Sequence, residues 1–146
     1  GDVSLISSTE GTLYAEISAL ADDGTSRYIS INDGSTSNFI SIAFFNNSTI
    51  TSRIAIGGAS TYLVSGVITQ TDNFKVAIKY KLNDYALWIN GVEVDSNNLL
   101  GVFAPNTLTR LDFRRLVAND LYGKVKALAV WKEALSDTEL TELTTL

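Results

Sequence analysis

Apolar and polar residues alternate from Phe74 to Lys81, with lysine at three of the four polar-side positions. A period of two with one apolar side is typical of a β-strand that buries one face. A second strand is predicted from Ala86 to Ile89. A third begins at Val92, because Asn90-Gly91 is the pair most favoured in two-residue hairpin turns. The stretch 74–94 therefore predicts three consecutive antiparallel strands.

The register of the first hairpin can be predicted if Asn83-Asp84 forms its turn. The predicted cross-strand pairs are then Tyr80 with Leu87, Ile78 with Ile89, Lys79 with Trp88 and Lys81 with Ala86. This register keeps apolar residues together on one face. It places Trp88 on the polar face, beside a lysine.

Further alternating segments are separated by short runs of Asp, Asn, Gly and Ser, which favour turns for backbone reasons. The predicted strands are Leu13 to Ala19, Arg27 to Ile31, Asn38 to Phe45, Ile50 to Ile56, Tyr62 to Ile68, Leu108 to Arg114 and Lys124 to Trp131, with a loop from Asp95 to Asn106. Ser136 followed by Glu139 is a capping box, and it predicts one short helical turn near the C-terminus.

Many short strands and no long helix predict an all-β protein, an antiparallel β-sandwich of jelly-roll type. An immunoglobulin-like sandwich is the alternative. It is disfavoured because the chain has 146 residues and lacks the Cys, Trp, Cys core pattern. Residues 1–146 are expected to form a single domain. Because the sequence starts at Gly1-Asp2 and contains no methionine, we expect it to be a fragment of a larger protein.

Composition removes several classes of function. The chain has no histidine and no cysteine, which excludes serine triads, thiol enzymes, thiolate metal sites and disulfides. No basic run with interleaved aromatic residues occurs, so we expect no nucleic-acid partner. The apolar runs are too short to cross a bilayer, and no membrane insertion is expected.

Three ordered pieces of the second half resemble a known family. They are the hairpin from Phe74 to Val92 with its Asn-Gly turn, the Gly-started strand from Leu121 to Trp131, and the closing segment from Ala134 to Leu140. Together they resemble the concanavalin A-like, laminin-G-like lectin domains of phage tail fibres and bacterial surface proteins. The first half agrees only in the spacing of its strands and turns.

The resemblance implies a concanavalin A-like sandwich that binds carbohydrate or a cell-surface receptor without catalysis. It implies a glycan or glycoconjugate partner, adhesion as the role, and an extracellular place on a virion tail or bacterial surface. A homo-oligomer formed through the parent protein is compatible with it. A structural spacer or assembly domain is the alternative from another class, since fold does not settle function.

Aromatic and polar side chains on loops and strand faces are the candidate ligand-binding residues, because aromatic rings stack on sugars and rigid sandwiches carry binding groups on loops. The candidates are Trp88, Tyr28, Tyr62, Arg114, Arg115, Asn119, Asp120 and Tyr122. For each aromatic residue, burial in the core is the competing interpretation.

Carboxylates and amides suggest two further chemistries. Glu93-Val94-Asp95 begins the Glu-x-Asp-x-Glu spacing of related glucanases, but Asn97 replaces the second glutamate, so a glycoside hydrolase is the third hypothesis. Calcium is a possible cofactor, because it prefers carboxylate and amide oxygens. Its candidate ligands are Asp22, Asp23, Asn32 and Asp33, which are equally ordinary turn residues.

Overall fold

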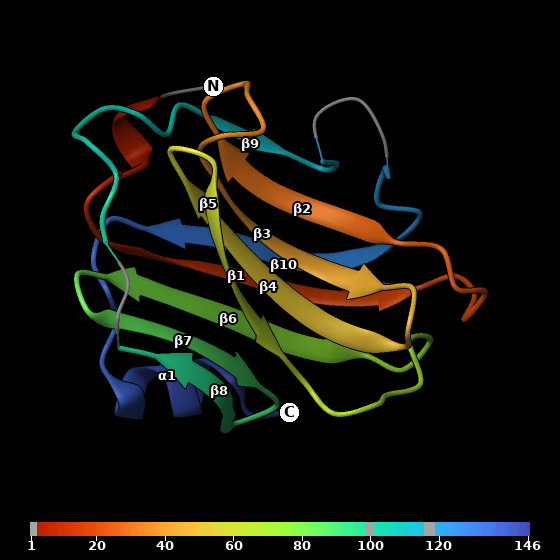
Figure 1. Ribbon diagram of the computed structural model, residues 1–146. Coiled ribbons are helices and arrows are strands. Elements are labelled where there is room, and N and C mark those ends of the chain that lie inside the picture. The colour runs from red at the N-terminus through yellow and green to blue at the C-terminus, as the bar shows by residue number, and fades with distance from the viewer. Residues whose placement is uncertain (1–2, 99–100, 116–118) are drawn as a thin grey trace.

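Two five-stranded antiparallel sheets face each other in the computed structural model, which describes residues 3–98, 101–115 and 119–146 (Figure 1). The elements are η1 (Val3–Leu5), β1 (Gly11–Ala19), β2 (Arg27–Asn32), β3 (Phe39–Phe45), β4 (Thr49–Ile56), β5 (Ala59–Val64), β6 (Phe74–Lys81), β7 (Asp84–Ile89), β8 (Val92–Asn97), β9 (Arg110–Asp112), β10 (Gly123–Trp131) and α1 (Asp137–Thr144). The front sheet has the order β5-β4-β3-β2-β9, and the back sheet has the order β10-β1-β6-β7-β8.

Strands that are distant in the sequence pair in both sheets. β1 lies between β6 and β10, and β2 pairs with β9. Alternation along each strand sends one set of side chains between the sheets, and buried apolar residues from both sheets fill that space. The predicted all-β sandwich of jelly-roll type is therefore confirmed. No helix among the described residues has the length and apolar character needed to span a membrane.

The predicted register of the first hairpin is wrong by two residues. Ile78 pairs with Leu87, Tyr80 with Tyr85, and Lys81 with Asp84. The turn is therefore Leu82-Asn83, where Asn83 adopts a φ of 57°, a conformation that asparagine tolerates. A shift of two keeps every side chain on its predicted face. It changes the cross-strand partner of Trp88 from Lys79 to Ala77.

Several strand boundaries also differ from the predicted ones. Gly57 and Gly58 both have positive φ and form a tight turn, so β5 begins at Ala59 and ends at Val64. β8 continues to Asn97, inside the stretch 95–106 predicted to be a loop. Within the predicted strand from Leu108 to Arg114, only β9 is extended.

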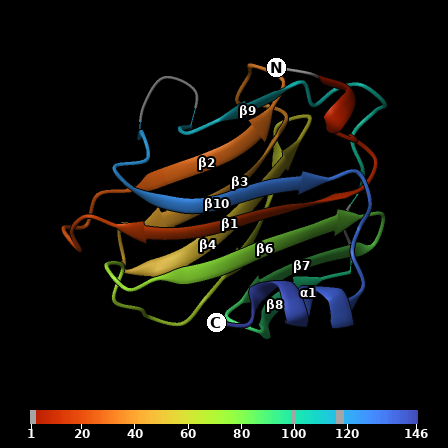
Figure 2. The same ribbon diagram turned by 180° about the vertical axis from the view of Figure 1, so that it is seen from behind.

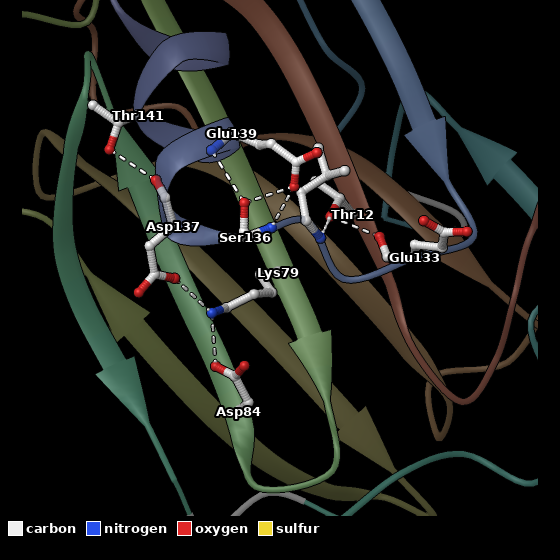
Figure 3. A network of polar contacts seen from close by, with 9 residues as sticks. Thr12, Lys79, Asp84, Glu133, Ser136, Asp137, Glu139 and Thr141 are labelled. Carbon is white, nitrogen blue, oxygen red and sulfur yellow. Dashed lines mark hydrogen bonds and ion pairs between the residues drawn. The ribbon is translucent and has the colours of Figure 1, made fainter.

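The helix α1 covers part of the outer face of the back sheet, over β6 and β7 (Figure 2). Its predicted capping box is present: the Ser136 hydroxyl accepts a hydrogen bond from the Glu139 amide, and the Glu139 carboxylate accepts one from the Ser136 amide. The Lys79 ammonium lies 2.9 Å from Asp137 and 3.0 Å from Asp84 (Figure 3). The helix is thus anchored to β6 by charge and capped by its own sequence.

The two lateral edges of the sandwich, where the sheets meet, differ. Between β5 and β8, the Asp95 carboxylate accepts a hydrogen bond of 3.0 Å from the Val64 amide, which joins the two sheets. Between β9 and β10, the sheet edges enclose a hollow of about 600 Å³. Its apolar lining residues are Leu5, Ile6, Leu111, Leu128, Ala129 and Val130. The core is therefore closed on one side and accessible on the other.

Candidate functional site

The outer face of the front sheet carries two arginines among aromatic rings. The register forms a row across four strands, with Tyr62 opposite Arg53, Arg53 opposite Ser41, and Ser41 opposite Ser30. These residues alternate with core residues such as Ile54 and Ile42, so their side chains point away from the core. We call Tyr28, Phe39, Arg53, Tyr62 and Arg115 the arginine patch.

Each guanidinium of the arginine patch contacts two aromatic rings. The guanidinium carbon of Arg53 lies 5.0 Å from the centroid of the Phe39 ring and 5.2 Å from that of Tyr62. The guanidinium carbon of Arg115 lies 5.9 Å from the Tyr28 ring and 5.7 Å from the Phe39 ring. These distances are within the range of cation–π attraction. The ring of Phe39 is therefore shared by both arginines, and it holds them on the same surface.

Neither arginine has a carboxylate partner within the described part of the chain. Arg53 donates two hydrogen bonds, of 3.1 and 2.8 Å, to the Ser60 hydroxyl of β5. This neutral partner orients the guanidinium and leaves its charge uncompensated. Both arginines are half-buried. A half-buried guanidinium without a counter-ion is a favourable site for an incoming carboxylate, because Arg binds carboxylates through two parallel hydrogen bonds.

Small side chains form the floor between the arginines. Ser41 and Ala43 are fully buried there, and the hollow above them measures about 40 Å³. Tyr62 is 50% exposed at one wall, so its ring is free to stack on a ligand. The site is shallow. It suits a group that lies on the face, such as a sugar ring with an acidic substituent.

The structure brings together three of the residues expected from the sequence, namely Tyr28, Tyr62 and Arg115. Of the two tyrosines only Tyr62 is accessible, because Tyr28 is 4% exposed and serves as a support for Arg115. Arg53 and Phe39 were not predicted. Arg53 is the only charged residue of β4, and Phe39 alternates with Ser41 and Ala43 on one face of β3. Arg53 is a single charged residue in a strand rich in β-branched residues, and this pattern in the sequence could have indicated the site.

The other expected ligand-binding residues lie elsewhere. Trp88 is 7% exposed and packs under α1 with Leu140, so the expectation of an accessible ring is not met. Arg114 is exposed next to the arginine patch, and its carbonyl accepts a hydrogen bond of 2.8 Å from Ser30. The segment before β10 exposes Asn119, Asp120 and Tyr122, and none of these side chains makes a hydrogen bond, ion pair or cation–π contact with the arginine patch.

The residues expected to bind calcium lie at opposite ends of β2. Asp23 accepts hydrogen bonds from the Thr25 amide and from Arg27, and these contacts lower the pKa of the carboxyl. Asp22 accepts hydrogen bonds from Ser48 and from the Gln70 amide. These carboxylates are therefore engaged in holding the turn that joins β1 to β2.

The second pair, Asn32 and Asp33, is equally engaged. Burial raises the pKa of Asp33, but hydrogen bonds from Ser35 and Asn38 outweigh it, and the net shift is downward. The side-chain oxygen Oδ1 of Asn32 accepts a hydrogen bond of 2.8 Å from the Gly34 backbone amide. Within residues 3–98, 101–115 and 119–146, no three or more acidic, histidine or cysteine side chains gather as a metal site would require.

Glu93 and Asp95 do not form the carboxylate pair of a glycosidase. β8 is irregular at this point, because Glu93 lies opposite Trp88 and Asp95 lies opposite Leu87. Trp88 and Leu87 are consecutive residues with opposite orientations, so the bulge directs the two carboxylates to different sides. Asp95 also holds the Val64 amide, as described above. An acid and a nucleophile must share one face to act on one bond.

Comparison with known proteins supports the fold. No family model matches the chain, and no curated protein sequence matches it. Among solved structures, the CBM40 of the Ruminococcus gnavus IT-sialidase is similar, with a TM-score of 0.79 and 17% identity over 95% of this chain and 84% of that one. The SAP-like pentraxin of Limulus polyphemus gives a TM-score of 0.68 and 14% identity over 94% and 70% of the two chains.

Mouse laminin α1 domains LG4-5 are also similar, with a TM-score of 0.64 and 10% identity over 89% of this chain and 37% of that one. The fold is therefore the concanavalin A-like, laminin-G-like jelly roll that the sequence pieces resembled. At these identities the likeness establishes the fold alone.

Proposed function

We propose that this chain is a non-catalytic carbohydrate-binding module whose arginine patch recognises a negatively charged sugar. The observation that carries the proposal is the pair of half-buried guanidiniums, Arg53 and Arg115, which have no carboxylate partner in the part of the chain that the structure describes and lie against aromatic rings. A sugar carboxylate would supply the missing counter-charge. The exposed ring of Tyr62 would stack on the apolar face of the sugar.

One of the similar structures offers a precedent for this chemistry. The CBM40 of the R. gnavus IT-sialidase has been solved bound to α2,3 sialyllactose and to α2,6 sialyllactose. Sialyllactose carries a single carboxylate, which is the group that the arginine patch lacks. We therefore propose a sialylated or similarly acidic glycoconjugate as the ligand of this chain.

The biological setting follows from the ligand and from the resemblance to phage tail and bacterial surface domains. A module with a shallow glycan site and no catalytic pair would serve as an adhesion or receptor-binding domain outside the cell. We propose a virion tail fibre or a bacterial surface protein as the parent. The separated carboxylates of Glu93 and Asp95 support a binding role over a hydrolytic one.

The test is a calorimetric titration with 3′-sialyllactose and with lactose. We expect binding of 3′-sialyllactose only, and Arg115→Ala should weaken it at least about tenfold, because a hydrogen-bonded charge contributes about 1.5–3 kcal/mol. The matched control is Lys124→Ala, which removes one positive charge from the outer face of the back sheet and should bind like the parent.

Equal binding of both sugars, or an unchanged affinity in Arg115→Ala, would contradict the proposed site. If no binding occurs with either sugar or with bacterial surface polysaccharides, the assembly-domain alternative replaces the glycan-binding one. Light scattering of the intact chain would then be the next measurement.

A further inference from the structure

A third arginine occupies the same outer face, beyond the arginine patch. Arg110 of β9 lies opposite Asn32 of β2, and Asp112 lies opposite Ser30. The residue between them, Leu111, lies opposite Ile31 and packs on the core, so Arg110 and Asp112 point outward. Arg110 therefore shares the face on which Arg115 lies.

The guanidinium of Arg110 lies over the turn that follows β2. A Cβ atom built at Gly34 would come within 2.9 Å of the guanidinium carbon of Arg110. Gly34 also has a φ of 88°, which glycine adopts without strain. The glycine therefore leaves room for Arg110 to lie flat on the turn.

Hydrogen bonds hold the turn beneath Arg110. Asn32 is only 1% exposed, and its side chain makes three hydrogen bonds: it accepts from the Gly34 amide and donates to Ser30 and to Asp112. The bond to Asp112, at 2.8 Å, holds the only carboxylate of β9. The side chain of Arg110 is exposed, and within the residues that the structure describes it makes no hydrogen bond or ion pair. Its guanidinium, like that of Arg115, therefore has no carboxylate partner there.

The guanidiniums of Arg115 and Arg110 are farther apart than the width of one sugar ring. Arg115 lies against the Tyr28 and Phe39 rings, whereas Arg110 lies over Gly34. Phe39 and Arg110 pair with Asn32 from opposite sides, so their backbones are two strand spacings apart, on the order of 10 Å. Four of the chain's five arginines, Arg53, Arg110, Arg114 and Arg115, lie on or next to this face, although the net charge is −5.

We infer that Arg110 forms a second anion subsite and that the ligand is a glycan with at least two acidic sugars, lying along β2 from Arg115 to Gly34. The inference rests on the proposed function for the first subsite. The buried polar row of Ser30 and Asn32 lies between the two charges. Asp112 carries the only carboxylate of β2 and β9, and it accepts a hydrogen bond from the Asn32 side chain.

The experiment compares two probes by calorimetry, 3′-sialyllactose with one carboxylate and a linear trimer of α2,8-linked sialic acid with three. We expect the trimer to bind at least about tenfold more tightly than 3′-sialyllactose. Arg110→Ala should remove that advantage and should leave the affinity for 3′-sialyllactose within about twofold. Such a tenfold change corresponds to about 1.4 kcal/mol.

Two further variants sharpen the comparison. Gly34→Asn keeps the charge of Arg110 and tolerates the positive φ, but its side chain displaces the guanidinium, so it should also lose the advantage for the trimer. Lys124→Ala removes one charge from the back sheet and should change neither affinity. Thermal melting of each variant confirms that it is folded.

The outcomes separate the two proposals. If 3′-sialyllactose binds but the trimer binds no more tightly, or if Arg110→Ala weakens both probes equally, the second subsite is refuted and the first stands. If neither probe binds to the parent chain, the proposed function fails, and the second subsite fails with it.

Discussion

Replacing Gly91 with valine should destabilise the whole back sheet, because this glycine makes two structural contributions at once. It closes the β7–β8 hairpin at a φ of 86°, and Asn90 before it has a φ of 50°. Its amide also donates a hydrogen bond of 3.0 Å to the hydroxyl of Thr144, the last residue of α1. A substitution here affects both the register of the hairpin and the attachment of the helix.

The magnitude can be estimated from these contacts. A β-branched residue at positive φ costs about 1–3 kcal/mol. A Cβ atom at position 91 would lie 3.0 Å from the Thr145 hydroxyl, so that side chain must move away, and if the bond to Thr144 is lost with it the cost is about 1 kcal/mol. The total of about 3 kcal/mol predicts a decrease in Tm of about 6–12 °C for a domain of this size.

Two matched variants separate the causes. Gly91→Asn introduces the same Cβ atom in a residue that tolerates positive φ, and it should cost only about 1 kcal/mol. Gly58→Val introduces the same valine at a φ of 88°, but with no atom within 4 Å of the new Cβ, so it reports the backbone strain alone. Calorimetric melting of the three variants gives the comparison. A Gly91→Val variant that melts like the parent, or no worse than Gly58→Val, would refute the structural reasoning.

Two other predictions concern the same half of the molecule. Burial raises the pKa values of Tyr80 and Tyr85. Burial lowers the pKa of Lys79, but the hydrogen bonds that its ammonium donates to Asp137 and Asp84 outweigh burial, and the net shift is upward. When the folded-state pKa is raised, the contribution of the group to the free energy of unfolding is fully present below the ordinary pKa values near 10 and decreases as the pH rises above them. Urea unfolding should therefore give a lower free energy of unfolding at pH 11 than at pH 8. Equal values at both pH values would contradict the prediction. Ser136→Ala removes the N-cap of α1 and should cost about 1 kcal/mol, measured as a Tm lower by about 3 °C, whereas an unchanged Tm would show that α1 is held by packing alone.

Local patterns in the sequence were sufficient for the strands and for one of the hairpin turns. The Asn90-Gly91 turn and the Ser136 capping box are present as expected, because both depend on residues close in the chain. The Leu82-Asn83 turn was misplaced by one position, since a lone Asn next to Asp offers two plausible turns. The error shifted the register by two residues, and the alternation alone could not reveal it, because a shift of two preserves both faces.

The candidate site is formed by strand pairings that local sequence patterns do not predict. Tyr28, Phe39 and Arg53 come together only because β2, β3 and β4 pair in one specific order. Arg115 joins them only because β9 pairs with β2 across a long separation in the chain. The choice between an accessible and a buried Trp88 could not be made from the sequence for the same reason, since the helix that buries it lies about fifty residues further along.

The irregularity in β10 affects how copies of this domain behave when they are crowded. β10 is a nine-residue strand at the edge of the back sheet, and a long, flat, apolar edge is a template for strands of other molecules. Its register with β1 skips Lys126, since Glu16 pairs with Ala127 and Ile17 with Val125. The resulting bulge twists the edge, and Lys126, 3.4 Å from Glu16, places a charge beside it. Both features disfavour the addition of a strand from another copy at this edge.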